Sequence, residues 1–284
     1  MLPSGVTTSY LEASPATGEN GAAVPTVVLL HGWMATAALN WYGVARALGT
    51  EYRVLAPDLR GHGRYGARAP RFTAEACAQD VADLLVEVAG GSVIVVGYSM
   101  GGAIAQVLAR RHPELLSGIV LCATAAKFAE RDWLHPVVRL VGWVGGTTAR
   151  ALPGLAAAFL RHRIGRHDAA GEAGGHHHPH WALEERCHSS LACFIEAGAD
   201  LNGFDSRPWL PSLTVPTAVV VTTTDRTVEP WRQDILTGLV PGAQRFTVEA
   251  GHDAAVAHMG IFLPVLERAC RALAAPPAGS AQGG

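Results

Sequence analysis

The sequence predicts an α/β fold, with a mostly parallel central sheet and flanking helices. Two observations lead to this prediction: short apolar runs recur along the chain, and longer segments with helical spacing lie between them. Near-continuous Val, Ile and Leu over five or six residues is typical of strands buried on both faces of a parallel sheet. Their alternation with helices indicates right-handed crossovers.

Six segments fit the strand pattern. They are TVVLLHG (26–32), YRVLAPD (52–58), SVIVVG (92–97), GIVLCA (118–123), TAVVVT (217–222) and QRFTVE (244–249). Three segments between or after them predict helices: 73–89, where Thr73 is a good N-cap, 99–112, which stops before a proline, and 261–274.

One interval breaks this rhythm. About ninety residues separate the fourth strand from the fifth, far more than a plain crossover needs, so they must hold an inserted subdomain. One expected helix carries apolar side chains on one face, namely Trp133, Val137, Leu140, Val141 and Val144. A second expected helix is suggested by Trp181, Glu184, Glu185, Leu191 and Phe194. Residues 171–181 predict a flexible loop. The expected division is a core over 1–123 and 213–274, the insertion over 124–212, and a disordered tail over 275–284.

Composition narrows the class of protein. The 284 residues are 49% hydrophobic and 16% charged, with a formal net charge of −2, which supports a sizeable core and excludes a basic nucleic-acid footprint. The five cysteines are scattered without a CxxC, so neither a disulfide framework nor a zinc site is expected. The first residues do not form a signal peptide, and the apolar stretches are too broken to span a membrane. We therefore expect a soluble, cytoplasmic protein.

The stretch Gly97-Tyr98-Ser99-Met100-Gly101 lies where a buried strand meets a helix. This spacing suits a sharp strand–turn–helix, in which the central residue is strained and flanking side chains would collide. Such a turn exposes the Ser99 hydroxyl at the carboxyl edge of the sheet, facing the N–H groups that begin the next helix. Ser99 is therefore the candidate nucleophile.

A serine nucleophile needs a base, and the base needs an orienting carboxylate. Asp225 follows the strand TAVVVT, and His252 follows the strand QRFTVE, so both come just after strand ends, where ligands of α/β proteins bind. Asp200 and Asp205 are rival acids, but they precede the strand. Asp253 and His258 are neighbours that could replace His252 or its partner.

An oxyanion needs two N–H donors. The backbone N–H of Met100, directly after the nucleophile, is one candidate. The backbone N–H of Trp33, in the loop after the first predicted strand, is the other.

Together these residues resemble the α/β-hydrolase superfamily. The resemblance rests on HGW (31–33), DLRGHGR (58–64), GYSMGG (97–102), the Asp225 segment and GH (251–252), and it extends over residues 26 to about 270. It implies an α/β-hydrolase fold in which residues 124–212 form a helical cap, or lid, over the pocket. Gly102 after Gly101 resembles the monoglyceride-lipase, esterase and thioesterase-like branches.

The resemblance also assigns and excludes roles. It implies that Asp58, Arg60 and His62 are structural residues of a loop that borders the site. Relatives that break carbon–halogen bonds or epoxides use an aspartate nucleophile, whereas position 99 is serine. One departure is that Thr222-Thr223-Thr224 precedes Asp225 where relatives often carry glycine, which affects the geometry of that loop.

The expected function is a serine hydrolase that cleaves a carboxylic ester with an apolar part, through an acyl-enzyme and without a cofactor. Candidate pocket residues are His31, Tyr98, Trp133 and Trp143. Leu134, Leu155 and Phe159 would add apolar wall, unless these insertion residues only pack the cap onto the core. The same triad permits thioester cleavage, acyl transfer, C–C hydrolysis or perhydrolysis, and a non-catalytic ligand receptor is the alternative from another class.

A histidine-rich run and several arginines in the expected insertion suggest further interactions. His176, His177, His178 and His180 suggest metal binding, but their loop is glycine-rich and lacks carboxylate or cysteine partners, so we expect no functional metal. The apolar insertion helices with Arg139, Arg150, Arg161 and Arg163 suggest an amphipathic surface that could meet a membrane, although the overall charge gives no support. The sequence does not specify an oligomeric state.

Overall fold

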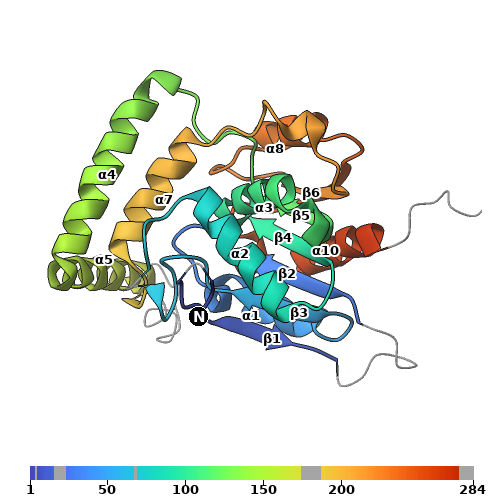
Figure 1. Ribbon diagram of the computed structural model, residues 1–284, viewed down its shortest axis with the longest axis horizontal. Coiled ribbons are helices and arrows are strands. Elements are labelled where there is room, and N and C mark those ends of the chain that lie inside the picture. Colours follow the sequence, from blue (N-terminus) through green and yellow to red (C-terminus); the bar gives the residue numbers. More distant parts are fainter. Residues whose placement is uncertain (4, 16–23, 67–68, 174–186, 275–284) are drawn as a thin grey trace, which may run out of the picture.

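A computed structural model of the chain describes residues 1–3, 5–15, 24–66, 69–173 and 187–274. Within these residues, seven strands form one sheet in the order β1-β3-β2-β4-β5-β6-β7 (Figure 1). Neighbouring strands are parallel except for β1 and β3, which are antiparallel. The predicted α/β fold with a mostly parallel sheet and flanking helices is therefore confirmed.

The elements alternate along the chain as the sequence indicates. The strands are β1 (Tyr10–Ala13), β2 (Thr26–Leu30), β3 (Arg53–Pro57), β4 (Val93–Tyr98), β5 (Leu116–Cys122), β6 (Thr217–Thr222) and β7 (Gln244–Val248). The helices are α1 (Ala37–Leu48), α2 (Ala74–Val88), α3 (Met100–Arg111), α4 (His135–Ala151), α5 (Pro153–Ala173), α7 (Leu191–Gly203), α8 (Pro230–Leu239), α9 (Ala254–Ala257) and α10 (Met259–Ala274). All six predicted strands are present, and α2, α3 and α10 are the three predicted helices.

The strands bury side chains on both faces, as their sequences require. Val27 and Leu29 of β2 face a core shared with α1, α9 and α10, whereas Val28 and Leu30 face a core shared with α2, α3 and α8. This alternation follows from the two-residue period of a strand, and it explains why β2 to β6 are apolar at nearly every position. The helices on both faces leave the carboxyl edge of the sheet for the loops.

Four elements were not predicted. The antiparallel edge strand β1 is only half buried, so it lacks the apolar run that marks the inner strands. Helix α1 has a recognisable signal, because Thr36 accepts a hydrogen bond from the N–H of Leu39 and buried Trp41 and Val44 follow at helical spacing. Helices α8 and α9 are short, at ten and four residues, and offer little periodicity.

The interval between β5 and β6, which includes the insertion expected over 124–212, contains α4, α5 and α7. Helix α4 lies outermost, and α7 lies between it and the rest of the molecule (Figure 1). Arg150 of α4 ties the insertion to the core: it pairs with Glu196 of α7 at 2.7 Å and donates to the carbonyl oxygen of Ala69. Glu196 in turn accepts from the backbone N–H of Phe72 at 2.9 Å.

The remaining expectations for the insertion and the tail are met only in part. The predicted loop over 171–181 is helical up to Ala173, where α5 ends. Of the other expected helix, Leu191 and Phe194 lie in α7, whereas Trp181, Glu184 and Glu185 lie outside the described residues. The tail over 275–284 also lies outside them, and the division at 123, 212 and 274 stays a prediction. Within the described ranges, none of the helices combines the length and apolarity that a membrane crossing needs.

Polar contacts connect the segment 58–64, which follows β3, to neighbouring elements. Asp58 accepts from the N–H of Ala37 at 2.9 Å and from the hydroxyl of Ser9 at 2.8 Å, while Arg60 forms a two-pronged ion pair with Asp80. These contacts fit the structural role that the family resemblance implies for this segment. They join the end of β3 to the starts of β1 and α1 and to the middle of α2.

Two histidines are buried behind this segment. The Nε2 of His31 accepts from the N–H of Leu59 at 2.9 Å, and its Nδ1–H donates to the carbonyl oxygen of Gly32 at 2.8 Å, which requires a neutral ring. The rings of His31 and His62 lie 5.0 Å apart. Burial lowers the pKa of His31 to about 4, and burial together with His31 lowers the pKa of His62 to about 3.

We expect these histidines to make the fold acid-sensitive. In the unfolded chain these histidines bind a proton near pH 6.5, whereas in the folded protein they do so only at far lower pH. Their contribution to the free energy of unfolding is therefore fully present above pH 6.5 and is lost as the pH falls from 6.5 toward the folded pKa. Between pH 7 and pH 5, His62→Phe should reduce this loss in free energy of unfolding by about 2 kcal/mol relative to the wild type. Urea unfolding at both pH values measures it.

His258→Gln is the matched control, because the side chain of His258 is half exposed. It should follow the wild-type pH dependence. Parallel pH curves for wild type and His62→Phe would show that His62 does not carry the effect.

Candidate active site

Ser99 occupies a tight turn between β4 and α3. Its φ is 52°, in the left-handed region that residues with a side chain rarely adopt. The turn is possible because Gly97 and Gly101 have no Cβ: one added at Gly97 would lie 2.7 Å from Gly102 Cα, and one added at Gly101 would lie 2.6 Å from the carbonyl carbon of Leu30. The predicted strand–turn–helix is therefore present, with Ser99 at its apex.

Two loops bring partners to this serine. Asp225 follows β6 and His252 follows β7, so both lie at the same carboxyl edge as Ser99. His252 Nδ1 lies 2.8 Å from Asp225 Oδ2, and His252 Nε2 lies 3.0 Å from Ser99 Oγ. In the tautomer that satisfies both contacts, Nδ1–H donates to the carboxylate and the Ser99 hydroxyl donates to Nε2.

The carboxylate of Asp225 is buried and fully hydrogen-bonded. Its Oδ1 accepts from the N–H groups of Thr227 and Val228 at 2.8 and 3.0 Å, and its Oδ2 also accepts from the hydroxyl of Thr222 at 2.9 Å. Burial alone would raise the pKa of Asp225, but the hydrogen bond and charge of His252, together with the two N–H donors, lower it below the ordinary value. Asp225 is therefore ionised at neutral pH, and the threonine that departs from the family pattern contributes one of its donors.

Tyr98 fixes the loop that carries His252. Its hydroxyl donates to the carbonyl oxygen of His252 at 2.8 Å, and its buried ring packs edge-on against Trp41 and Phe262. The predicted pocket residue Tyr98 therefore lies at the site, where it links the turn at Ser99 to the histidine loop.

The rival residues are engaged elsewhere. Asp200 accepts from the N–H of Ala74 at 2.8 Å, and Asp205 pairs with Arg207 at 2.6 Å, so neither contacts His252. Asp253 lies at the pocket, but its contact is with His258 at 3.9 Å.

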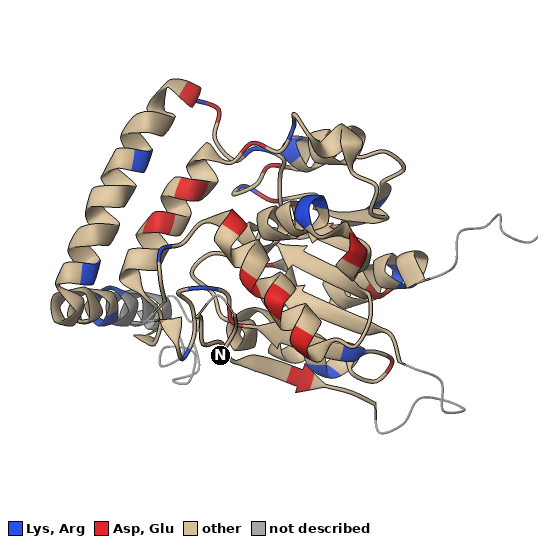
Figure 2. Cartoon of the chain, in the orientation of Figure 1, with Lys and Arg blue, Asp and Glu red and all other residues tan. Residues whose placement is uncertain are grey.

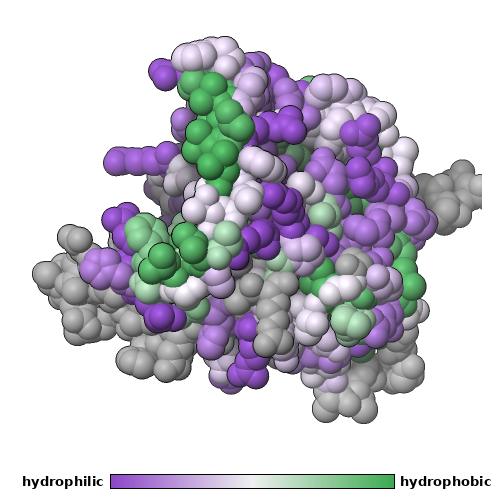
Figure 3. Space-filling view, turned by 60° about the vertical axis from the view of Figure 1, so that its left-hand side comes forward, coloured by the Kyte–Doolittle hydropathy of each residue, from purple (hydrophilic) through white to green (hydrophobic). Residues whose placement is uncertain are grey.

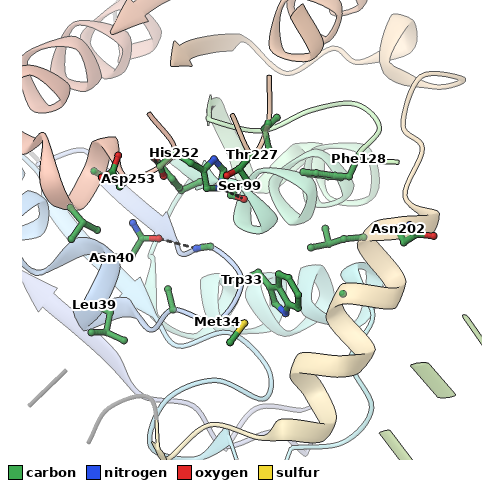
Figure 4. Close-up of a pocket in the computed structure, with 18 of the residues that line it drawn as sticks. Trp33, Met34, Leu39, Asn40, Ser99, Phe128, Asn202, Thr227, His252 and Asp253 are labelled. Carbon is green, nitrogen blue, oxygen red and sulfur yellow. Dashed lines mark hydrogen bonds between the residues drawn. The ribbon is translucent and has the colours of Figure 1, made fainter. Parts of the chain in front are cut away.

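The loop after β2 is held from two sides. The N–H of Gly32 donates to Asn40 Oδ1 of α1 at 2.9 Å, and the indole N–H of Trp33 donates to the carbonyl oxygen of Phe194 of α7 at 3.0 Å (Figure 4). A Cβ added at Gly32 would lie 3.6 Å from Ser99 Cβ, so this loop passes directly beside the serine. Within the described residues, the backbone N–H groups of Trp33 and Met100 donate no hydrogen bond. Both remain available to an added acceptor.

A cavity of about 610 Å³ opens beside Ser99 and His252. Figure 4 shows it bordered by the loop after β2, helix α7 and the loops that carry the histidine and Thr227. Most of its wall is apolar, formed by Trp33, Met34, Leu39, Phe128, Leu201, Val228, Ala255 and Val256. Its polar side chains beyond the serine and histidine include Asn40, Asn202, Thr227 and Asp253, and no Lys or Arg is among the lining residues.

Three of the residues predicted for the pocket lie elsewhere. His31 is fully buried behind the loop and does not reach the cavity. Trp133, in the turn before α4, is 72% exposed, and Trp143 of α4, whose ring lies beside Arg71, is 55% exposed; neither lines the cavity. The insertion contributes α7 to the wall, and Leu201 and Asn202 were not predicted. Their helical spacing after Phe194 was the available signal.

The described residues contain no group of three or more His, Cys, Asp or Glu side chains arranged to hold a metal ion. His176, His177, His178 and His180, which suggested metal binding, lie outside the described residues.

A turn with a central serine, a histidine and a buried aspartate on one edge of a parallel sheet define a class of protein. The chain matches the family model described as alpha/beta hydrolase fold over residues 25–258, and it belongs to that family. It is a hydrolase of this fold, as the sequence resemblance implied.

Among curated relatives, the chain is similar to proteins named pimeloyl-[acyl-carrier protein] methyl ester esterase. It is 30% identical to that of Aeromonas hydrophila over 86% of this chain and 94% of the relative. With that of Chromobacterium violaceum it is 41% identical, over 40% of this chain and 43% of the relative, which is less than half of that protein.

Solved structures share the fold. An enol-lactonase from Burkholderia xenovorans superposes with a TM-score of 0.69 at 24% identity, covering 92% of this chain and 95% of that one. An esterase from Exiguobacterium antarcticum superposes with a TM-score of 0.71 at 21% identity, covering 95% and 97%.

The geometry of the site predicts that the hydroxyl of Ser99 reacts selectively with an electrophile. We expect a fluorophosphonate to label the protein once, at Ser99, because His252 Nε2 lies within hydrogen-bond distance of its oxygen. Peptide mass spectrometry identifies the labelled residue. Ser99→Ala should abolish labelling, whereas Ser190→Ala should not, since the Ser190 hydroxyl caps α7. Labelling that persists in Ser99→Ala would contradict the prediction.

Proposed function

We propose that the protein is a serine esterase that cleaves a carboxylic ester with an apolar acyl or alcohol part. The observation that carries this proposal is the continuous hydrogen-bonded series from Asp225 through His252 to Ser99, at 2.8 and 3.0 Å, opening on an apolar cavity. The similarity to proteins named as methyl ester esterases supports ester cleavage.

In the proposed mechanism, His252 takes the proton of Ser99 as Oγ attacks the ester carbonyl. Asp225, ionised and buried, holds the imidazole in the required tautomer and stabilises the imidazolium that forms. The backbone N–H groups of Trp33 and Met100 receive the developing oxyanion, because both lie next to Ser99 in the fold and neither has an acceptor in the described structure.

Collapse of the tetrahedral intermediate breaks the bond to the alcohol oxygen, which leaves with the proton carried by His252. Water then attacks the acyl-enzyme with His252 again as base, and release of the acid restores the Ser99 hydroxyl. The Tyr98 hydroxyl acts through His252, by holding its carbonyl oxygen.

The cavity wall supports a neutral, apolar substrate portion. Its largest side chains are Trp33, Phe128 and Leu201, and none of the described residues that line it is a cation that could receive a carboxylate. Among the described residues, Asp253 is the acidic residue of the lining; it lies next to His252 and disfavours an anionic group near the reacting carbonyl.

A series of p-nitrophenyl esters from acetate to palmitate tests the proposal. We expect wild-type turnover to peak at an intermediate acyl length, because a closed apolar wall rewards added methylenes only until the cavity is filled. Ser99→Ala should reduce kcat/KM by about a thousandfold or more across the series.

The control is the fluorophosphonate reaction on the same preparation. Labelling at Ser99 without turnover of any ester would contradict ester specificity and favour the thioester or C–C substrates that the same triad permits. Absence of both labelling and turnover would contradict the hydrolase mechanism itself and favour a ligand receptor.

The position of the Trp33 N–H should depend on the contact of its indole with Phe194. In Trp33→Phe the ring remains but the 3.0 Å hydrogen bond is lost, so the loop is less firmly held and the oxyanion less well bound. We expect kcat for an ester to fall by about tenfold with little change in KM.

Comparison with the corresponding thionoester separates this effect from general damage. Sulfur is a weak hydrogen-bond acceptor, so hydrolysis of the thionoester should be almost unaffected by Trp33→Phe. Trp133→Phe, on the exposed side of the insertion, is the matched control and should change neither rate. An equal loss for both substrates would contradict the proposed role of the loop.

A further inference from the structure

The insertion presents bulky apolar side chains to solvent. On α4 these are Leu140 and Val141, 61% and 63% exposed, with Val137 and Val144 on the same side. The full set, which we call the apolar outer face, is Trp133, Val137, Leu140, Val141, Trp143, Val144, Leu152, Leu155 and Phe159. Figure 3 shows apolar side chains as a column along α4 and as a second group lower down, where α5 lies, with less apolar residues between the two. Exposed apolar residues of this size and number mark an interaction surface.

The close packing of α4 against α7 explains why the large apolar side chains of α4 face solvent. Gly142 and Gly146 are buried against α7, where a Cβ at Gly142 would collide with Ala199 and one at Gly146 would lie 2.7 Å from Glu196 Oε1. A surface helix of a globular protein ordinarily turns its large apolar residues toward the core. Here the close approach of α4 to α7 requires glycine on the inner side, so the large apolar residues can only point outward.

The charged residues in the segment that carries this face are all basic. Residues 133–163 contain four arginines and no Asp or Glu, although the whole chain has a formal net charge of −2. Figure 2 shows basic residues along α4 and an acidic residue only at its beginning. Arg150 points inward to Glu196, and Arg139 lies toward Gly203 and Asp200 of α7. Arg161 and Arg163 are exposed, and Arg163 follows Leu155 and Phe159 at helical spacing on α5.

Exposed apolar side chains together with arginines favour a lipid bilayer over a second copy of the chain as the partner of this face. In a symmetric dimer formed through this face, the same patch would meet itself, so arginines would approach arginines with no carboxylate in the segment to pair with them. An anionic bilayer satisfies both features: its acyl region accepts the apolar side chains, and its headgroups pair with the arginines. The two tryptophans suit the boundary between these regions.

We propose that the apolar outer face of the insertion binds the surface of an anionic lipid bilayer. The helices lie on the membrane and do not cross it. Helix α7 lines the catalytic cavity with Leu201 and packs against α4 on its other side, so the bound bilayer is one helix away from the cavity wall. The proposal goes beyond ester cleavage and does not depend on it.

Flotation with lipid vesicles tests this directly. The full-length protein should float with phosphatidylcholine vesicles that contain 30% phosphatidylglycerol, a composition chosen for the assay, and at least about fivefold less with pure phosphatidylcholine at low salt. Raising the salt concentration to about 0.5 M should weaken binding to the anionic vesicles, since the headgroup contribution is screened.

Substitutions separate the apolar from the charged contribution. Replacing Val137, Leu140, Val141 and Val144 together by serine should reduce vesicle binding about tenfold or more, because the buried apolar area is lost. Arg163→Glu, on the face of α5 that carries Phe159, should reduce binding to anionic vesicles and leave the weak binding to neutral ones unchanged. Both variants should keep wild-type hydrolysis of a short dissolved ester, or wild-type fluorophosphonate labelling if no ester is turned over, since they do not touch the cavity.

The matched control carries serine at three apolar residues exposed elsewhere: Val86, Ile235 and Ile261. It should bind vesicles like the wild type. In addition, brominated phospholipid should quench tryptophan fluorescence of the wild type much more than that of the Trp133→Phe, Trp143→Phe double variant.

Three results would overturn the proposal. The first is absence of flotation with anionic vesicles, and the second is equal loss of binding in the control. The third is a dimer in sedimentation velocity that the four-serine variant abolishes while vesicle binding is absent, which would assign the face to a second copy.

Discussion

The turn at Ser99 depends on two glycines, Gly97 and Gly101. At both positions the backbone packs so closely against another part of the backbone that a side chain would not fit. Gly97 packs against the first turn of α3, and Gly101 packs against the end of β2, so strand and helix can meet at a sharp angle with Ser99 at φ 52°. The strain at Ser99 is held by the sheet, since its N–H donates to the carbonyl oxygen of Cys122 in the neighbouring strand. Moving either glycine contact would move the hydroxyl, the N–H of Met100 and the direction of α3 together.

The other parts of the site are positioned relative to that turn. Tyr98 connects it to the histidine loop, Asn40 connects the loop after β2 to α1, and Trp33 connects the same loop to α7. Each is a single hydrogen bond, and those of Tyr98 and Trp33 join elements far apart in the chain. The reacting groups are therefore held by the sheet, by α1 and by the insertion at once, and a displacement of any one of them reaches Ser99.

Sequence patterns identified what depends on local rules. The inner strands follow from apolar runs, the turn from its glycines, and Asp225 and His252 from their places after β6 and β7. The contacts of Tyr98 and Trp33 could not be predicted, because they depend on distances between residues about 150 positions apart. The periodicity of α4 correctly places its apolar residues on one face. It does not say which neighbour that face meets, and so Trp143 of α4, like Trp133 just before that helix, was wrongly expected to face the cavity.

The glycine contact between α4 and α7 has a consequence for how this protein can change over evolution. Because the inner side of α4 meets α7 at Gly142 and Gly146 and through Arg150, substitutions on its outer side leave the packing of α7 unaltered. Substitutions at Leu201 or Asn202 of α7 can likewise reshape the cavity without altering what α4 displays. The surface that α4 exposes and the wall of the cavity are thus encoded by separate sets of residues, and selection can adjust one while the other stays fixed.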